Sequence, residues 1–221
     1  MSATAAVALF AAAFVLTHFL LSHPLRDPLA RRLSERGFSA LYSVVALATF
    51  VPMVLARRNV GPEAPLWSVP DLAWLAAALL VWGGSILFVG SFVRNPAMVN
   101  PGGRPVAIGE PGGVFRITRH PMMWGFALWA LAHILVQPEP SAMVIAAAVL
   151  VLALGGAAGQ DRKKERLLGE QWSRWTQRTS FVPFGRGLAP PGWFAALGGT
   201  ILFVAATWAH PVPVGVWRWL A

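Results

Sequence analysis

Histidine is the residue type in this chain that is best suited to chemistry. The 221 residues include no cysteine, which excludes thiolate ligands, disulfides and cysteine nucleophiles. Within the apolar segments the only acidic residue is Asp71, at one end, so carboxylate-bridged metal pairs and carboxylate proton relays are excluded as well. Imidazole remains, and it is both a proton carrier near neutral pH and a usual ligand of haem iron. The candidates are His18, His23, His120, His133 and His210.

The spacing of these histidines argues against a site on one helix. His18 and His23 are five residues apart, about 140° around a helix, so they do not share a face. His120 and His133 point to nearly opposite faces of one helix and lie about 20 Å apart along it. Any histidine site must therefore combine helices. For His23 and His210, near segment ends, the simpler interpretation is a hydrogen bond to a carbonyl or a headgroup.

Residues 113–125, with the sequence GVFRITRHPMMWG, predict an anion site at a helix N-terminus. Pro121 suits the first helical position, and three basic side chains then gather where the helix dipole favours anions: Arg116, Arg119 and His120. The alternative is structural, because arginines also flank membrane spans on the cytoplasmic side. Gly125 and the pair at 155–156 would let a flat ligand or another helix approach the backbone closely.

The elements that carry these residues are predicted to be membrane spans. The chain is 56% hydrophobic and only 12% charged, whereas about a quarter of a soluble domain is charged. Its apolar blocks are near the 20 residues that a hydrocarbon core of roughly 30 Å requires of a helix. We therefore predict an all-α polytopic transmembrane helical bundle with six spans and one domain, residues 1–221. The expected spans are 1–21, 38–56, 71–93, 121–136, 142–160 and 193–209. The first span lacks the basic residues that open a cleaved signal peptide, so we expect it to be kept in the mature protein.

The basic residues predict an orientation. The first, third and fifth connectors hold 15 of the 18 lysines and arginines, which places these connectors in the cytoplasm and both termini outside. A net charge of +9 beside apolar spans fits anionic lipid headgroups, so membrane lipid is the expected partner and nucleic acid is not. Sixteen of the 18 are arginine, and with the heavy use of alanine this is typical of a GC-rich bacterial genome. We expect a multi-pass protein of a bacterial inner membrane.

Two cytoplasmic connectors carry structure of their own. Residues 94–119 contain Pro-Gly-Gly twice, at 101–103 and 111–113, which predicts an interfacial lid or a re-entrant segment. In the fifth connector, an apolar face at i, i+4 and i+7 predicts an amphipathic interfacial helix: Leu168, Trp172 and Trp175. This helix either lies in the headgroups or forms a wall of the active cavity.

Four motifs in chain order resemble the NnrU family of integral membrane proteins: LTHFLLSHPLR at 16–26, TRHPMMWG at 118–125, LWALAH at 128–133 and RTSFVPF at 178–184. That family is named after a gene linked to nitrite and nitric oxide reduction in denitrifying bacteria, and it is related to 15-cis-zeta-carotene isomerase. The resemblance implies haem b with His18 and His133 as axial ligands. It also implies a redox partner and either cis/trans isomerisation of an apolar carotenoid-like polyene or a role in nitrite and nitric oxide metabolism. Ala130 stands where the isomerase has an exchangeable cysteine ligand.

A more distant resemblance implies a different cofactor. Arg119-His120-Pro121 with Gly125, and later the segment 165–175, are similar to motifs of isoprenylcysteine and phospholipid methyltransferases. Those enzymes bind S-adenosylmethionine, which this resemblance would place near Arg119, His120 and Glu165. The tyrosine of their first motif is absent here. The competing functions are thus a haem-dependent isomerase, a membrane methyltransferase and a non-catalytic partner of another membrane complex.

Depth in the bilayer suggests other histidine pairs than the motifs do. With both termini outside, His18 lies roughly 22 Å from the outer face and His133 roughly 6 Å from it. By depth alone His18 pairs with His120, and His133 pairs with His210. The motifs favour His18 with His133, and both possibilities are carried forward.

Overall fold

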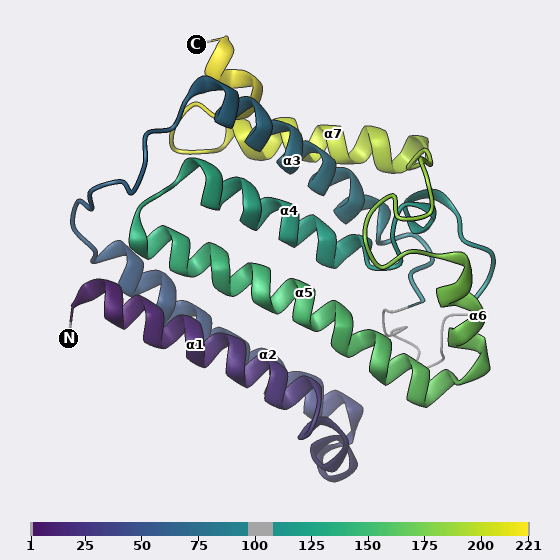
Figure 1. The fold of residues 1–221 in the computed structure, drawn as a ribbon. Helices are drawn as coiled ribbons and strands as arrows, with labels where there is room; N and C mark the ends of the chain where they lie inside the picture. The colour runs from purple at the N-terminus through teal and green to yellow at the C-terminus, as the bar shows by residue number, and fades with distance from the viewer. Residues whose placement is uncertain (1, 97–107, 221) are drawn as a thin grey trace.

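The computed structural model describes residues 2–96 and 108–220, and every regular element in these ranges is helical (Figure 1). The all-α prediction is confirmed for this part of the chain. Residues 97–107, which include the first Pro-Gly-Gly of the predicted lid, lie outside the described ranges. The seven α-helices there are α1 (Ala3–Ser22), α2 (Arg26–Arg58), α3 (Asp71–Gly90), α4 (Pro121–Val136), α5 (Pro140–Leu168), α6 (Glu170–Arg178) and α7 (Trp193–Trp208), with short 3-10 helices η1 (Gly113–Arg116) and η2 (Gly215–Trp219).

Six of these helices coincide with the six predicted spans. Four of them, α1, α2, α3 and α5, are long and apolar enough to cross a membrane. The other two, α4 and α7, have 16 residues each, or about 24 Å, which is short of a hydrocarbon core of roughly 30 Å. The structure therefore supports a membrane protein with four candidate spans in the described residues, and the number six stays a prediction.

The helices pack in an order that places α5 and α4 at the centre. The α1–α2 hairpin lies against α5, α5 lies against α4, α4 lies against α3, and α3 lies against α7 (Figure 1). Glycine allows the closest of these approaches. A Cβ atom added to Gly84 of α3 would lie 3.0 Å from the carbonyl oxygen of Gly125 of α4, and one added to Gly125 would lie 2.9 Å from that of Gly84. Gly125 thus serves helix packing.

An aromatic ring of α1 and the ring of the residue that follows this helix pack closely against two glycines of α5. A Cβ atom added to Gly155 would lie 2.6 Å from Cζ of Phe19, and one added to Gly159 would collide with the His23 ring. The Phe19 and His23 rings stack on one another with centroids 6.2 Å apart. Burial, and next the nearby positive charge of Lys163, lower the pKa of His23. The α1–α5 seam therefore depends on two glycines of α5.

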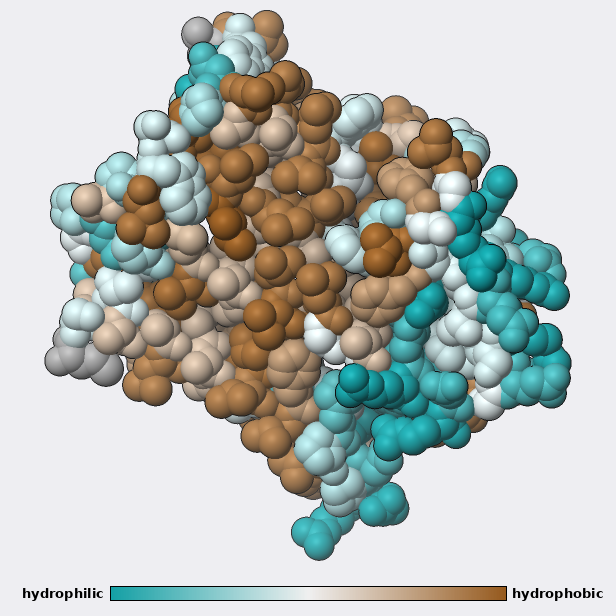
Figure 2. All heavy atoms as spheres, in the orientation of Figure 1, coloured by the Kyte–Doolittle hydropathy of each residue, from teal (hydrophilic) through white to brown (hydrophobic). Residues whose placement is uncertain are grey.

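The described parts of the basic connectors gather at one end of the bundle. Figure 1 places both ends of the described chain at the end opposite to α6. Figure 2 shows an apolar belt across the middle of this face and a concentration of hydrophilic residues at the lower right, where α5, α6 and the α1–α2 turn lie in Figure 1. Which end faces the cytoplasm stays a prediction from the positive-inside rule.

Two local features differ from the sequence predictions. Helix α2 starts at Arg26, not at residue 38, and it is broken at Ser34, whose φ of 65° and ψ of 167° are not helical. Trp172 and Trp175 of α6 are 1% and 4% exposed and pack with Phe115 of η1 and neighbouring apolar residues. The apolar face of α6 therefore packs against the protein, and the position of this helix at the membrane interface stays a prediction.

At the other end of the molecule, Glu63 ties the α2–α3 connector to two helices. Its carboxylate accepts hydrogen bonds from the Thr4 hydroxyl (2.9 Å), the Ser141 backbone N–H (3.0 Å) and the Ser141 hydroxyl. These bonds, with the Ser141 hydroxyl as the largest cause, hold the pKa of Glu63 below its ordinary value. The negative charge also suits the N-terminus of α5.

Candidate functional site

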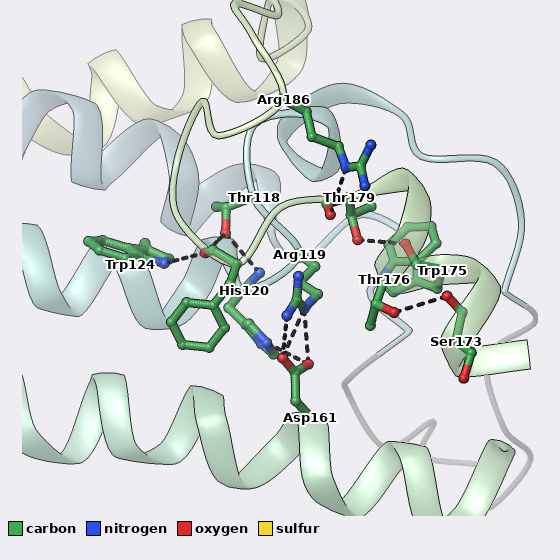
Figure 3. A network of polar contacts seen from close by, with 11 residues as sticks. Thr118, Arg119, His120, Trp124, Asp161, Ser173, Trp175, Thr176, Thr179 and Arg186 are labelled. Carbon is green, nitrogen blue, oxygen red and sulfur yellow. Dashed lines mark hydrogen bonds and ion pairs between the residues drawn. The ribbon is translucent and has the colours of Figure 1, made fainter. Parts of the chain in front are cut away.

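A polar cluster at the start of α4 joins this helix to α5 (Figure 3). Arg119 donates from Nε to both carboxylate oxygens of Asp161 (3.1 and 2.9 Å) and from Nη2 to Oδ2 (2.6 Å). His120 donates from Nε2 to Oδ1 of the same carboxylate at 2.9 Å. The His120 side chain is completely buried, and the other two are largely buried. One carboxylate thus partners two neighbouring side chains.

The segment after α6 encloses this cluster. The carbonyl of Phe181 accepts hydrogen bonds from the Thr118 hydroxyl and from Nε1 of Trp124, both at 2.7 Å. The Phe181 ring lies 5.4 Å from the Arg119 guanidinium carbon and meets the His120 ring edge to face. Residues of two of the family motifs, 118–125 and 178–184, therefore build one structure around Asp161.

The sequence predicts that an anion binds at this helix N-terminus. In the structure the anion bound there is a side chain of the same protein, the Asp161 carboxylate. Sequence reasoning missed Asp161 because it directly follows the predicted span 142–160. A signal was present, since Asp161 is the only acidic residue between positions 140 and 164. Arg119 and His120 are therefore together, as predicted, and both are engaged by Asp161.

A small cavity of about 110 Å³ adjoins the cluster. It is lined by Asn95, Arg119, His120, Pro121, Met122, Met123 and Gln160. Because Nε2 of His120 donates to Asp161, Nδ1 is the acceptor atom of the neutral ring. Among the described residues this buried Nδ1 has no hydrogen-bond partner. The cavity has room for water, about 30 Å³ each, or a small polar group.

A cavity of about 490 Å³ runs along α4 from Gly125 to Gln137, where α3, α4 and α7 meet. Its lining is almost entirely apolar and includes five large aromatic side chains: Trp74, Phe88, Phe126, Trp129 and Phe203. Such a concave, apolar and aromatic surface with few polar groups is typical of a small-molecule site. The polar groups are few, and His133, Gln137 and His210 are among them.

Two predicted histidines meet at this cavity. His133 donates from Nδ1 to the carbonyl of Trp129 at 2.8 Å, and its ring centroid lies 3.9 Å from that of Trp129. Nδ1 of His210 lies 3.2 Å from the carbonyl of Val212. Because a carbonyl only accepts, Nδ1 of His133 carries the proton and its Nε2 is left as the acceptor atom. For His210, the N–H of Val212 also donates to Nδ1, at 3.5 Å. Both line one cavity, in keeping with the depths predicted for them.

His18 lies elsewhere. Its Nδ1 donates to the carbonyl of Phe14 at 2.7 Å, and its ring packs edge-on to that of Tyr42 of α2, with centroids 5.2 Å apart. Figure 1 shows α5 between α1 and α4. His18 does not line the 490 Å³ cavity. The structure therefore does not bring His18 and His133 to a common cavity.

This placement bears on the predicted haem. Two axial ligands of one iron lie on opposite faces of one macrocycle, so both must border the cavity that holds it. His18 and His133 do not, and this pair does not fit a haem between them in the arrangement described. The predicted S-adenosylmethionine site near Arg119, His120 and Glu165 stays a prediction.

Comparisons with known proteins agree with the sequence resemblance. The family model described as NnrU protein matches residues 6–218. The chain is 28% identical over 209 residues to "15-cis-zeta-carotene isomerase, chloroplastic" of Arabidopsis thaliana, covering 86% of this chain and 56% of that protein. It is likewise 28% identical over 210 residues to the protein of the same name from Zea mays, covering 85% and 55%.

The chain thus spans about half the length of the curated relatives that it matches. No solved structure matches it significantly. Since the family model covers nearly the whole chain, the chain belongs to the NnrU family.

Proposed function

We propose that this protein is a membrane isomerase that binds a carotenoid-like polyene in the 490 Å³ cavity. The observation that carries the proposal is the cavity itself, which is apolar, rich in aromatic side chains and placed between helices that expose apolar residues. The relatives named as carotene isomerases support the same substrate class. The membrane in which we place the protein is the bacterial inner membrane.

The cavity residues would supply binding and orientation. The aromatic rings of Trp74, Trp129 and Phe203 offer flat apolar surfaces against which a conjugated polyene packs. Because the rings cover the bound polyene, they exclude water from it. Holding a cis chain bent or a trans chain straight changes the relative stability of the bound isomers. The shape of the cavity therefore decides which isomer binds more tightly.

Haem b is not a step in this proposal, because the predicted ligands His18 and His133 do not share a cavity. The prediction is tested by the absorption spectrum, oxidised and dithionite-reduced, of protein purified from haem-replete cells. A stoichiometric Soret band that is lost on changing His133 would support haem binding at that residue. A redox partner becomes relevant only in that case.

A matched pair of variants tests the proposed site. Ala206 lines the cavity, whereas its exposed neighbour Ala205 does not. The Ala206→Phe variant fills part of the cavity, and we expect it to reduce conversion of a cis-polyene added in detergent micelles at least tenfold, as followed by chromatography of the isomers. The Ala205→Phe variant should keep the wild-type rate. Equal rates in the two variants would place catalysis elsewhere.

A further inference from the structure

Positively charged side chains of two helices meet where the α1–α2 turn packs against the end of α5. A Cβ atom added to Gly159 would collide with the His23 ring, so the turn lies against this part of α5. Lys163 follows Gly159 by four residues, which places both on the same face of the helix. Arg26, the first residue of α2, is the charged group that acts most strongly on the ammonium groups of Lys163 and Lys164. Three positive charges from α2 and α5 therefore lie close together.

Nearby carboxylates neutralise these charges only in part. Arg26 donates to the carboxylates of Asp27 and Glu35, at 3.5 and 2.9 Å, and both carboxylates are largely exposed. Each carboxylate acts on Lys163 less strongly than Arg26 does. Lys163 forms no hydrogen bond or ion pair with another described residue, although its side chain is partly buried. The seam between the start of α2 and the end of α5 thus joins like charges, which repel one another and have lost part of their hydration.

This basic cluster lies at the depth of lipid headgroups. Lys163 is three residues beyond the predicted span 142–160, or about 5 Å along the helix axis, and the headgroup layer occupies about 5–8 Å on each side of the hydrocarbon core. Figure 2 shows that the hydrophilic residues of this region adjoin the apolar belt. Leu20 of α1 and Leu25 of the turn are 48% and 42% exposed and offer an apolar surface beside the charges. An amphiphile with a negative head and apolar chains matches this surface.

We propose that the phosphate group of an anionic phospholipid binds between Arg26 and Lys163 and joins the α1–α2 hairpin to α5. A phosphate placed there replaces one repulsion between like charges by two attractions, and its oxygens accept hydrogen bonds from the guanidinium and ammonium groups. Lys164 lies at the edge of this site, because its Nζ already donates to the carbonyl of Pro96 at 3.0 Å.

The placement of these charges is more specific than membrane topology requires. The positive-inside rule predicts on which side of the membrane the basic residues lie, but it does not require that they meet across a helix seam. The proposed lipid site shares no residue with the 490 Å³ cavity. It therefore holds or fails independently of the proposed isomerase activity.

Thermal unfolding of the purified full chain in mixed micelles tests the proposal. Dodecyl maltoside micelles receive the same mole fraction of anionic phosphatidylglycerol or of zwitterionic phosphatidylcholine. We expect phosphatidylglycerol to raise the midpoint temperature of unfolding by about 3–6 °C over phosphatidylcholine, the shift that a ligand at about ten times its dissociation constant gives a chain of this size. Inorganic phosphate, added with phosphatidylcholine at the concentration of the anionic lipid, should give no such shift.

Two variants that each remove one positive charge from the same end of the bundle locate the site. Lys163→Gln should lose roughly half or more of the shift that phosphatidylglycerol causes. Arg174→Gln should retain the shift, because Arg174 lies on α6 and pairs with Glu170. Lys163→Arg keeps the charge and should retain the shift as well. In phosphatidylcholine, Lys163→Gln should unfold at no lower a temperature than the wild type, because this variant removes a repulsion.

Several results would overturn the proposal. Equal midpoints of the wild type in the two lipids would mean that no anionic lipid binds. An equal loss of the shift in Lys163→Gln and Arg174→Gln would mean that the lipid is attracted to the whole basic surface. An equal shift with inorganic phosphate would assign the cluster to a soluble anion. Lys164→Gln, at the edge of the site, should lose a smaller part of the shift, and it provides the test if Lys163→Gln does not fold.

Discussion

Asp161 of α5 links this helix to the residues at the start of α4. Its carboxylate accepts hydrogen bonds from Arg119 and from His120, whose side chain is completely buried. Removing a charged partner leaves the other charge buried and uncompensated, which is strongly destabilising. We expect Asp161→Asn to lower the stability of the detergent-solubilised protein by about 3 kcal/mol, measured by thermal unfolding.

An exposed ion pair provides the control for this prediction. Asp71 is 71% exposed and lies 3.2 Å from Nη2 of Arg218. Exposed pairs contribute little, so Asp71→Asn should change stability by less than about 1 kcal/mol. Similar losses of stability in the two variants would show that the buried contacts of Asp161 contribute no more to stability than an exposed ion pair does.

Glu63 predicts a dependence of stability on pH. Its pKa in the folded chain is lowered from the ordinary value of 4.5, mainly by the Ser141 hydroxyl. A lowered folded pKa means that the carboxylate stabilises the fold above the unfolded value and that this contribution is lost as the pH falls through the folded value. The midpoint temperature of thermal unfolding of the wild type should therefore decrease as the pH is lowered below about 4.5.

The Glu63→Gln variant should have a lower midpoint at pH 7 and should lack this part of the decline on acidification. Thermal unfolding between pH 7 and pH 3 measures both quantities. Parallel pH profiles for the wild type and the variant would contradict the assignment to Glu63.

Individual residues of the sites were predictable where one helix carries the signal. Arg119, His120 and Pro121 are adjacent in the sequence, so their gathering at a helix start follows from local rules. Asp161 is 41 residues away, and only tertiary packing brings it there. The His133–His210 proximity followed from depth in the bilayer, because helices that cross one membrane share a common axis of depth.

At the scale of elements, close helix contacts make some glycines irreplaceable. A Cβ atom on Gly199 of α7 would lie 2.6 Å from the backbone nitrogen of Ile86 in α3, which cannot move without its helix. We expect Gly199→Ala to separate α7 from α3 and to cost about 1–3 kcal/mol, measured by thermal unfolding.

Gly83 of α3 supplies the contrast, because nothing lies within 4 Å of an added Cβ. Alanine favours a helix by about 1 kcal/mol over glycine, so Gly83→Ala should be neutral or stabilising. If the two substitutions have the same effect, helix propensity and not packing decides the outcome.

Helix positions were predictable from apolar runs, and helix ends less so. The prediction for α4, residues 121–136, agrees with the structure because Pro121 marks its start. Helix α2 begins twelve residues earlier than predicted, since hydropathy detects only the apolar part after the break at Ser34. The buried face of α6 was not predictable, because a tryptophan stripe suits a lipid interface and a protein core equally well.

For the whole molecule, the orientation in the membrane is open to a direct test. The chain has no cysteine, so a single introduced cysteine is labelled against a clean background. Ser68 lies in the α2–α3 connector and Gln177 in α6, at opposite ends of the bundle, and both are exposed. In bacterial cells, an impermeant maleimide should label Ser68→Cys at once and Gln177→Cys only after permeabilisation. The reverse pattern would invert the topology.

Because of the packing order, the α1–α2 hairpin is synthesised well before the helix against which it packs. The α1–α2 hairpin lies against the rest of the bundle mainly through the seam between α1 and α5, where Phe19 and His23 meet Gly155 and Gly159. About 80 residues separate the end of α2 from the start of α5. At about 5–20 residues per second, the ribosome needs roughly 4–16 seconds to deliver the partner helix. During this interval the hairpin lies in the lipid, and the face that later packs against the α5 glycines has no protein partner. The hairpin is then most accessible to a chaperone or a neighbouring protein.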